Sequence, residues 1–239
     1  MQTLAGKVVL ITGGSKGIGY GIAEALLQQN MRVAITSRGE EAAQSAGDQL
    51  KTSAKGEVLA LQADVRSLED QKRSVQQIMD KWGQLDVLVA NAGIGHFASI
   101  EELTPEQWQE TIDTNLTGVF YSVKASLEGL KASNGYVITI SSLAGTNFFA
   151  GGAAYNASKF GLTGFTQAVM LDLRQSGINV STIMPGSVST YFNDQNPSEA
   201  DAWKIQQEDL GQMVVNLLQM NPRTLPSKIE VRPARPPVK

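Results

Sequence analysis

The first thirty residues hold the feature that most constrains how this chain can fold. Residues 7–12 form a short apolar run rich in β-branched side chains, and the next seven residues contain four glycines. Residues 20–29 then place apolar side chains on one face of a helix, namely Ile22, Ala23, Leu26 and Leu27. A buried strand, a glycine-rich turn and a helix in this order predict an α/β fold with a phosphate-binding turn, because the helix N-terminus presents unpaired N–H groups.

The glycine spacing of this turn is Gly-x-x-x-Gly-x-Gly, whereas the commoner dinucleotide-binding turn has Gly-x-Gly-x-x-Gly. A tight structural turn is the alternative interpretation, and the strand and helix on either side favour cofactor binding. Glycine lets the backbone approach a ligand closely and lets the helix lie against the strand. The residues expected at the cofactor are Gly13, Ser15, Lys16, Gly17, Ile18 and Gly19.

Strand-like and helix-like segments alternate along the rest of the chain, which is typical of a parallel sheet covered by helices on both faces. Thr104 is expected to cap a helix that begins at Pro105, since proline fits a first helical turn. We expect one domain over residues 1–239. The expected strands are residues 7–12, 32–36, 57–62, 86–89, 136–140, 178–183 and 229–231, and the expected helices are residues 20–29, 40–52, 68–82, 105–130, 155–175 and 209–220.

The composition argues against several classes of function. The 239 residues carry a net charge of −3, whereas a nucleic-acid-binding face needs an excess of Lys and Arg. The absence of cysteine excludes disulfides and thiolate catalysis, and the single histidine, His96, cannot build a histidine-rich metal site, so we expect no metal. No apolar run approaches the ~18 residues that span a bilayer, and the first strand begins too near Met1 for a signal peptide. We therefore expect a cytoplasmic protein without nucleic-acid or membrane partners.

Tyr155 and Lys159 are four residues apart in a predicted helix, which puts both side chains on one face. An ammonium near a phenol favours the tyrosinate, so we expect Lys159 to lower the pKa of Tyr155 from its free value of about 10. Such a tyrosine can donate a proton to a carbonyl oxygen. The same pair also occurs by chance on surface helices. Ser142, just after the strand expected at 136–140, adds a hydroxyl that can hydrogen-bond the same oxygen.

Taken together, these segments resemble the short-chain dehydrogenase/reductase superfamily. The matching segments are Thr12-Gly13-x-x-x-Gly17-x-Gly19, Asn91-Ala92-Gly93, Asn115, Ser142, Tyr155-x-x-x-Lys159 and Pro185-Gly186, in the family's order. The resemblance covers nearly the whole chain, from about residue 4 to about residue 231. It implies a single-domain Rossmann fold, with a doubly wound parallel sheet of about seven strands in the order 3-2-1-4-5-6-7. It also implies an oxidoreductase that transfers hydride between a nicotinamide cofactor and a carbonyl group.

The resemblance implies a role for each matching residue. Tyr155 would donate the proton, Ser142 would bind the carbonyl oxygen, and Lys159 would lower the tyrosine pKa and hold the nicotinamide ribose. Asn115 would distort the long helix locally and hold a water that relays protons to Lys159. The other expected cofactor contacts are Asp64 and Val65 at the adenine, Asn91, Ala92 and Gly93 along the cofactor, and Pro185, Gly186, Val188 and Thr190 near the nicotinamide.

Some of these residues have structural alternatives. Asp64 fits a turn or a helix cap equally well, and Asn91 can stabilise the turn that contains it as well as line the cofactor. Homotetramers and homodimers are usual in the family and form through the long helices. Apolar side chains on those helices, such as Phe120, Phe165 and Val169, therefore fit either a contact between copies or the core.

The end of the second strand bears on the choice of cofactor. An NAD enzyme usually has Asp or Glu there for the adenine ribose, whereas this chain has Ser37 and Arg38. A guanidinium can grip a 2′-phosphate with two parallel hydrogen bonds, and Lys16 offers a second cation. The alternative interpretation is that Lys16 and Arg38 are simply solvated charges on the surface. The pattern favours NADP(H).

The expected substrate is a small molecule with a ketone or aldehyde group that is reduced to an alcohol. The resemblance implies a lid at residues 191–207, and the expected pocket residues are Ser142, Tyr155, His96, Phe148, Phe149, Tyr191 and Phe192. The aromatic residues also fit ordinary packing, and His96 also fits an exposed loop. A 3-oxoacyl thioester reductase is the alternative activity, and a non-catalytic NADP(H)-binding sensor or regulator is another. Residues 232–239 are expected as an extended tail.

Overall fold

The computed structural model describes residues 2–53 and 55–236. They form one seven-stranded parallel sheet in the order β3-β2-β1-β4-β5-β6-β7, which confirms the predicted Rossmann fold. The strands are β1 Val8–Thr12, β2 Arg32–Ser37, β3 Val58–Gln62, β4 Val87–Ala90, β5 Tyr136–Ile140, β6 Asn179–Pro185 and β7 Lys228–Val231. The α-helices are α1 Gly17–Gln28, α2 Glu40–Ser53, α3 Leu68–Trp82, α4 Pro105–Ile112, α5 Gly118–Ser133, α6 Ala153–Leu173 and α7 Gln207–Leu218.

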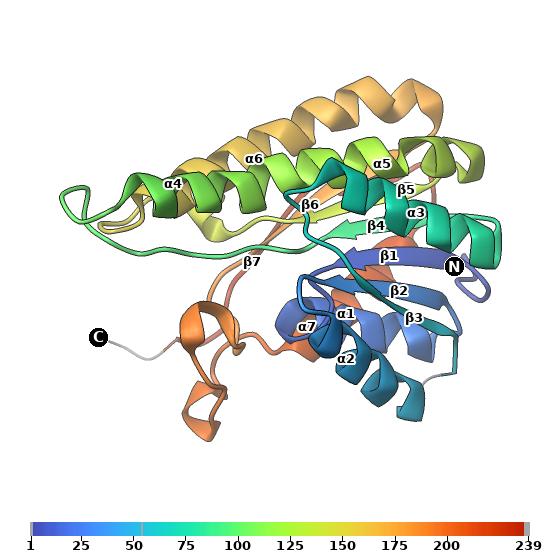
Figure 1. Cartoon of the computed structure of the whole chain (residues 1–239), viewed down its shortest axis with the longest axis horizontal. Coiled ribbons are helices and arrows are strands. Elements are labelled where there is room, and N and C mark those ends of the chain that lie inside the picture. The colour runs from blue at the N-terminus through green and yellow to red at the C-terminus, as the bar shows by residue number, and fades with distance from the viewer. Residues whose placement is uncertain (1, 54, 237–239) are drawn as a thin grey trace.

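Helices cover both faces of the sheet (Figure 1). Helices α3, α4, α5 and α6 lie on one face, and α1, α2 and α7 lie on the other. Side chains of a strand alternate between these layers, so Val9 and Ile11 join the core under α1 and α7, while Val8 and Leu10 join the core under α5 and α6. Because both faces are buried, β1 is apolar almost throughout, as its sequence indicated.

The register of the strands brings their carboxyl ends to one edge of the sheet. Thr12 at the end of β1 pairs with Thr36 of β2, and Ile11 pairs with Val89 of β4. The chain leaves β1 towards β2 on one side, whereas β4 lies on the other side. This reversal of strand order opens a crevice at the carboxyl edge, which is where open α/β sheets bind ligands.

The helix expected over residues 105–130 is interrupted. α4 and α5 are joined by a π-helical turn, Asp113–Thr117, so the chain continues in one direction with a local irregularity around Asn115. The start of α4 is as predicted. The Thr104 hydroxyl accepts a hydrogen bond from the Gln107 N–H (3.2 Å), and the Gln107 side chain accepts one from the Thr104 N–H (3.1 Å).

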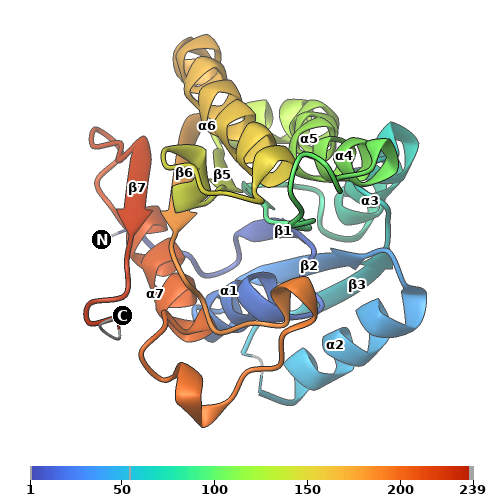
Figure 2. The same cartoon turned by 90° about the vertical axis from the view of Figure 1, so that its left-hand side faces the viewer.

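The segment expected as a lid contains little regular structure. Residues 191–207 include short 3₁₀ turns at Phe192–Asp194 and Glu199–Asp201, and Val188 and Ile205 form an isolated bridge (Figure 2). Its function as a lid stays a prediction. Residues 232–236 have no helix or strand, and residues 237–239 of the expected tail lie outside the described residues.

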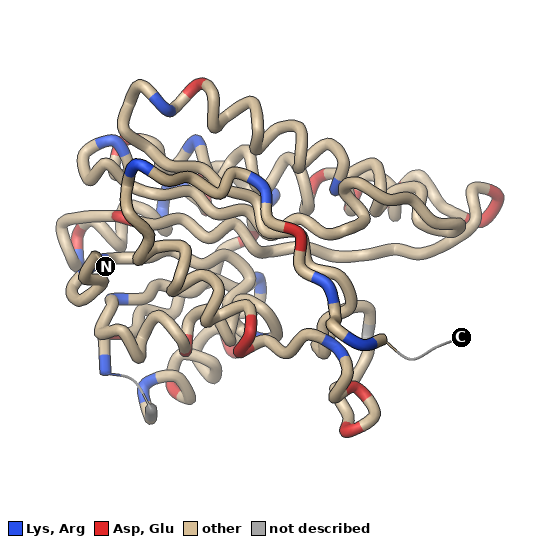
Figure 3. The backbone as a smooth tube through the Cα atoms, turned by 180° about the vertical axis from the view of Figure 1, so that it is seen from behind, with Lys and Arg blue, Asp and Glu red and all other residues tan. Residues whose placement is uncertain are grey.

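The surface carries charges of both signs. Figure 3 shows acidic and basic residues interspersed over the back of the molecule. Two apolar residues of α6, Phe160 and Leu171, are exposed, as is Phe120 of α5, which contacts Phe165 edge-on at 6.3 Å between ring centroids. Association of copies through this face stays a prediction. Within the part of the chain that the structure describes, no helix has the length and apolarity needed to cross a bilayer.

Glycines set the distance between α1 and α7. A methyl group on Gly211 would lie 2.6 Å from the carbonyl oxygen of Gly21, and a methyl group on Gly21 would lie 2.7 Å from that of Gln207. Real side chains do not tolerate such distances, so the two helices can approach this closely only with glycine at both positions.

We expect Gly211→Ala to lower the free energy of unfolding by about 1–3 kcal/mol, the usual cost of overpacking. The sign is informative because alanine is otherwise the better helix former. Urea denaturation followed by circular dichroism measures the change. Gln212→Ala, at the exposed neighbouring position of α7, is the control and should change stability by less than ~0.5 kcal/mol. Equal stability of the two variants would contradict the close approach.

Candidate active site

The glycine turn between β1 and α1 fits closely against the loop after β4. Gly13 has a φ of +65°, and a methyl group on it would lie 2.8 Å from the Ala92 Cα. A methyl group on Gly19 would lie 2.5 Å from both the Gly13 carbonyl oxygen and the Asn91 side-chain nitrogen. Lys16 is the N-cap residue of α1, and no described side chain caps this helix. Its first N–H groups therefore remain for a ligand at the sheet edge.

Asn91 holds this turn in place. Its side-chain nitrogen donates hydrogen bonds to the carbonyl oxygens of Thr12 and Gly13, both at 3.0 Å. The Thr12 hydroxyl accepts hydrogen bonds from the N–H groups of Asn91 (3.1 Å) and Ala92 (3.2 Å). The turn-stabilising alternative for Asn91 is therefore present, and its contact with a cofactor stays a prediction.

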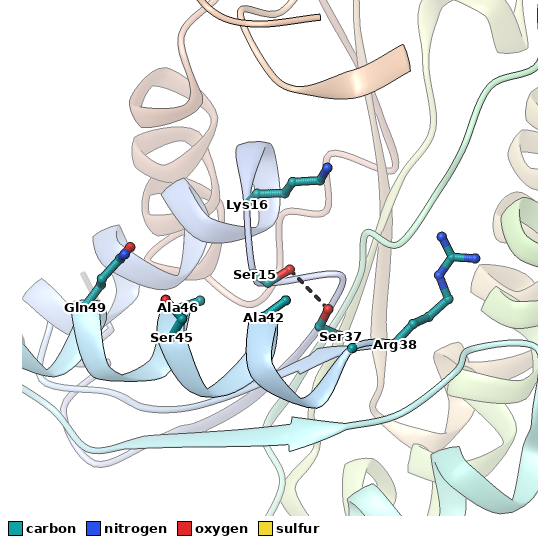
Figure 4. Close-up of a pocket in the computed structure, with 9 residues that line it drawn as sticks. Ser15, Lys16, Ser37, Arg38, Ala42, Ser45, Ala46 and Gln49 are labelled. Carbon is teal, nitrogen blue, oxygen red and sulfur yellow. Dashed lines mark hydrogen bonds between the residues drawn. The ribbon is translucent and has the colours of Figure 1, made fainter. Parts of the chain in front are cut away.

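A cavity of about 500 Å³ adjoins the glycine turn (Figure 4). Ser15 and Lys16 line it from the turn, Ser37 and Arg38 from the end of β2, and residues of α2 from the side. The Ser15 hydroxyl donates a hydrogen bond to the Ser37 hydroxyl (3.3 Å). The predicted 2′-phosphate residues thus surround one cavity. Arg38 directs its guanidinium away from α2, and its Nη1 lies 3.5 Å from the Glu110 carboxylate of α4.

The structure supports the turn alternative for Asp64. Its Oδ1 accepts a hydrogen bond from the Arg66 N–H (2.9 Å), and the Arg66 guanidinium lies 2.7 Å from Oδ2. The Arg66 hydrogen bond holds the pKa of Asp64 below its usual range. Ser67, rather than Asp64, caps α3. Val65 is buried against Gly118, and the expected adenine contacts of both residues stay predictions.

Asn115 lies in the π-helical turn and is fully buried. Its side-chain oxygen accepts a hydrogen bond from the Ile94 N–H (2.8 Å). Its side-chain nitrogen donates to the Ile94 carbonyl oxygen (2.9 Å) and to the Ser158 hydroxyl (3.0 Å). Ser158 in turn donates to the Tyr155 carbonyl oxygen (2.8 Å). The expected helix distortion is therefore observed, and Asn115 ties the loop after β4 to α6.

Ser142, Tyr155 and Lys159 come together at the carboxyl end of β5. The Ser142 hydroxyl accepts a hydrogen bond from the Ala144 N–H (3.1 Å) and shares one with the Tyr155 phenol. The Lys159 ammonium donates to the Ile140 carbonyl oxygen (3.0 Å) and lies 5.7 Å from the centroid of the Tyr155 ring. The predicted hydroxyl, phenol and ammonium thus form one group.

The pKa of Tyr155 differs from the expectation. Burial raises the pKa of Tyr155, and the Ser142 hydrogen bond opposes this only in part. The expected lowering is therefore wrong for this structure: burial has the largest effect on the phenol, and the Lys159 ammonium donates to the Ile140 carbonyl oxygen and lies over the face of the ring. Lys159 is 5% exposed, and burial lowers its pKa to about 8. At neutral pH the pair is a neutral phenol and an ammonium.

Aromatic rings surround Tyr155. Phe97 lies 5.3 Å and Phe192 lies 5.7 Å from it between ring centroids, and Phe149 lies 5.8 Å from Phe97. Phe149 and Phe192 were predicted at the pocket, and Phe97 was missed. A methyl group on Gly95 would lie 2.8 Å from Phe192 and 2.9 Å from Phe97, so this glycine makes room for both rings, but this contact exists only in the folded structure.

Other predicted pocket residues lie outside this aromatic group. Phe148 is 86% exposed, and Tyr191 is also exposed. His96 Nε2 lies 3.0 Å from a Glu110 carboxylate oxygen, so this side chain belongs to the charged cluster near Arg38. Their contacts with a substrate stay predictions.

The segment after β6 completes the edge of the site. The Gly186 N–H donates to the Val231 carbonyl oxygen (2.8 Å), which fixes Pro185 and Gly186 beside β7. A methyl group on Gly17 would lie 3.4 Å from the Thr190 side chain. Thr190 and the glycine turn therefore face one another, whereas Val188 pairs with Ile205, and both Val188 and Ile18 pack against the core.

Comparison with known proteins agrees with this geometry. A profile of the family described as short chain dehydrogenase matches residues 7–201. The 3-oxoacyl-(acyl-carrier-protein) reductase FabG of Vibrio cholerae is 37% identical over 190 residues, which cover 79% of this chain and 76% of that protein.

Solved structures are similar over nearly the whole chain. An alcohol dehydrogenase from the archaeon Thermococcus sibiricus, complexed with 5-hydroxy-NADP, has a TM-score of 0.90 at 27% identity, covering 97% of this chain and 99% of that chain. A metagenomic short-chain oxidoreductase in complex with NADP has a TM-score of 0.85 at 31% identity, covering 98% and 100%. Since the family profile spans most of the sequence and its segments meet at one sheet edge, the chain belongs to the short-chain dehydrogenase/reductase family.

Proposed function

We propose that this oxidoreductase uses NADPH to reduce a ketone or aldehyde to an alcohol. The observation that carries the proposal is the group formed by Ser142, Tyr155 and Lys159 at the carboxyl edge of the sheet. A hydroxyl and a protonated phenol that share a hydrogen bond can both donate to one carbonyl oxygen. The glycine turn of α1 opens on the same edge, so a dinucleotide bound there reaches this group.

When bound, NADPH supplies the hydride that adds to the carbonyl carbon. Ser142 and Tyr155 hold the carbonyl oxygen, and Tyr155 gives its Oη proton to that oxygen as negative charge develops on it. Burial keeps Tyr155 protonated before the reaction, which is the state that a proton donor needs. Lys159 is an ammonium below a pH of about 8 and stabilises the tyrosinate that remains after proton transfer.

The residues around the cavity beside the glycine turn fit a nicotinamide cofactor with a 2′-phosphate. Lys16, Ser37 and Arg38 line the same cavity, and the end of β2 holds no carboxylate that would repel the phosphate. Arg38 can bond a phosphate in a forked geometry, and no described carboxylate pairs with Lys16. The structures of two similar proteins contain NADP or 5-hydroxy-NADP, which supports the same choice for this chain.

The aromatic group around Tyr155 favours a substrate with an apolar substituent next to its carbonyl. Phe97, Phe149 and Phe192 offer ring faces and edges to such a group. The similarity to a 3-oxoacyl-(acyl-carrier-protein) reductase supports a second candidate, reduction of a 3-oxoacyl thioester. A non-catalytic sensor would not need the buried Lys159 and the phenol-to-serine hydrogen bond that the structure contains.

We expect Tyr155→Phe to lower the rate of carbonyl reduction by about 10²–10⁴-fold, because the proton donor is removed. The dissociation constant for NADPH should stay nearly unchanged. The assay follows the loss of NADPH absorbance with ketones, aldehydes, diketones and short 3-oxoacyl thioesters, and their ranking separates the two candidate activities. Tyr121→Phe makes the same chemical change outside the site and should retain full activity. Unchanged turnover in Tyr155→Phe would overturn the proposal.

The rate of reduction should depend on pH through Lys159. Its pKa of about 8 means that the ammonium, which stabilises the tyrosinate, is present below that pH and lost above it. We expect kcat/KM for reduction to fall by about tenfold per pH unit above this value. In Lys159→Arg the fall should move to higher pH, since arginine stays protonated. A wild-type profile that is flat to high pH would show that the charge on Lys159 has no role.

The double variant Lys16→Ala, Arg38→Asp should weaken NADPH binding by about tenfold or more, since charge-assisted hydrogen bonds to the phosphate are lost. NADH lacks the 2′-phosphate, so its affinity should change little. Isothermal titration calorimetry measures both dissociation constants. Ser45→Ala, a neutral change in the wall of the same cavity, is the control. Equal losses for the two cofactors would contradict the assignment of the 2′-phosphate site.

A further inference from the structure

A cluster of five charged or titratable side chains lies at the cofactor-binding edge, and the reaction as proposed uses only one of them, Arg38. Arg38 follows β2, Asp64 and Arg66 follow β3, His96 lies in the loop after β4, and Glu110 lies in α4. Four segments that are far apart in the sequence therefore contribute charges to one place.

Glu110 is the centre of this cluster. Its Oε1 lies 3.5 Å from Arg38 Nη1 and 3.6 Å from Arg66 Nη1, and its Oε2 lies 3.0 Å from His96 Nε2. The His96 hydrogen bond and the two guanidinium groups hold the pKa of Glu110 below its usual range, so it is a carboxylate at neutral pH. Arg66 is already bonded at 2.7 Å by Asp64. Arg38, by contrast, has Glu110 as its only ion-pair partner among the described residues.

This pairing sets the direction of the Arg38 side chain. The guanidinium extends away from the α2 residues that line the cavity beside the glycine turn (Figure 4) and meets the Glu110 carboxylate of α4. A 2′-phosphate bound between Lys16, Ser37 and Arg38 needs the same guanidinium. Binding of NADPH therefore exchanges one anion for another on Arg38, whereas NADH binding leaves the Arg38–Glu110 pair intact.

We propose that Glu110 is a specificity-determining residue, an internal anion that competes with the 2′-phosphate of NADPH for Arg38. This inference rests on the proposed cofactor site. Both side chains are partly exposed, 55% for Arg38 and 36% for Glu110, so their attraction is that of a solvated ion pair. Pairs of this kind change an equilibrium by about two- to fivefold. Glu110 thus moderates the preference for NADPH and does not reverse it.

The test is the charge-removing variant Glu110→Gln, studied by isothermal titration calorimetry with NADPH and NADH. We expect NADPH to bind about two- to fivefold more tightly than to the wild type, with NADH unchanged. The gain should shrink at high salt, because exposed charges are screened. Glu106→Gln is the matched control: it removes the same charge from the same helix, at a residue that is in no described ion pair, and should change neither affinity. Thermal melts establish that each variant is folded.

A second pair of variants tests the route of the effect. In an Arg38→Ala background, Glu110→Gln should give no gain, because the contested guanidinium is absent. A gain that persists there, an equal gain for NADH, an equal gain in Glu106→Gln, or no gain in the single variant would each overturn the role of Glu110. If Arg38→Ala itself leaves NADPH affinity unchanged, the proposed 2′-phosphate site fails instead, which separates the two conclusions.

Discussion

The buried amide of Asn115 is the interaction on which the geometry of the site depends. It makes three hydrogen bonds, two to the backbone of Ile94 in the loop after β4 and one to Ser158 in α6. Because the amide is fully buried, losing any partner would leave a polar group unsatisfied at a cost of about 1–3 kcal/mol. The loop and α6 therefore keep one relative position, and this position sets Tyr155 and Lys159 against Ser142 at the end of β5.

The π-helical turn explains how Asn115 reaches both partners. In an uninterrupted α-helix, the side chains after residue 113 would point in other directions around the helix axis. With the wider turn at Asp113–Thr117, the Asn115 amide faces Ile94 and Ser158. π-helical turns are rare, and unusual backbone of this kind persists where the surrounding structure holds it in place. Here the three side-chain hydrogen bonds of Asn115 hold the turn in place. A local irregularity in the backbone is thus tied directly to the placement of Tyr155 and Lys159 beside Ser142.

The fold was predictable from the sequence because β-branched runs and helical periodicity are local signals. β1 and α1 lie close to the residues predicted for them. The four-residue spacing also placed Tyr155 and Lys159 on one face of α6. What it missed depends on burial and on distant partners. The pKa of Tyr155 rises because desolvation outweighs the Ser142 hydrogen bond, and Phe97 lies beside Tyr155 only through tertiary packing. Arg38 lines one cavity with Lys16 and Ser37, and nothing local in the sequence shows that Glu110 pairs with it.

The two ends of the site control charge in opposite ways. Lys159 is buried without a carboxylate partner among the described residues, so its charge state follows from desolvation and changes little with salt. At the other end, the partly exposed Glu110 carboxylate pairs with the partly exposed guanidinium groups of Arg38 and Arg66. These ion pairs are weak, screened by salt and easily exchanged. In the proposed mechanism, burial suits the end where the proton moves, because the protonation state must be fixed before the reaction. Exposure suits the proposed 2′-phosphate site, because a solvated guanidinium can exchange a carboxylate for a phosphate and back again.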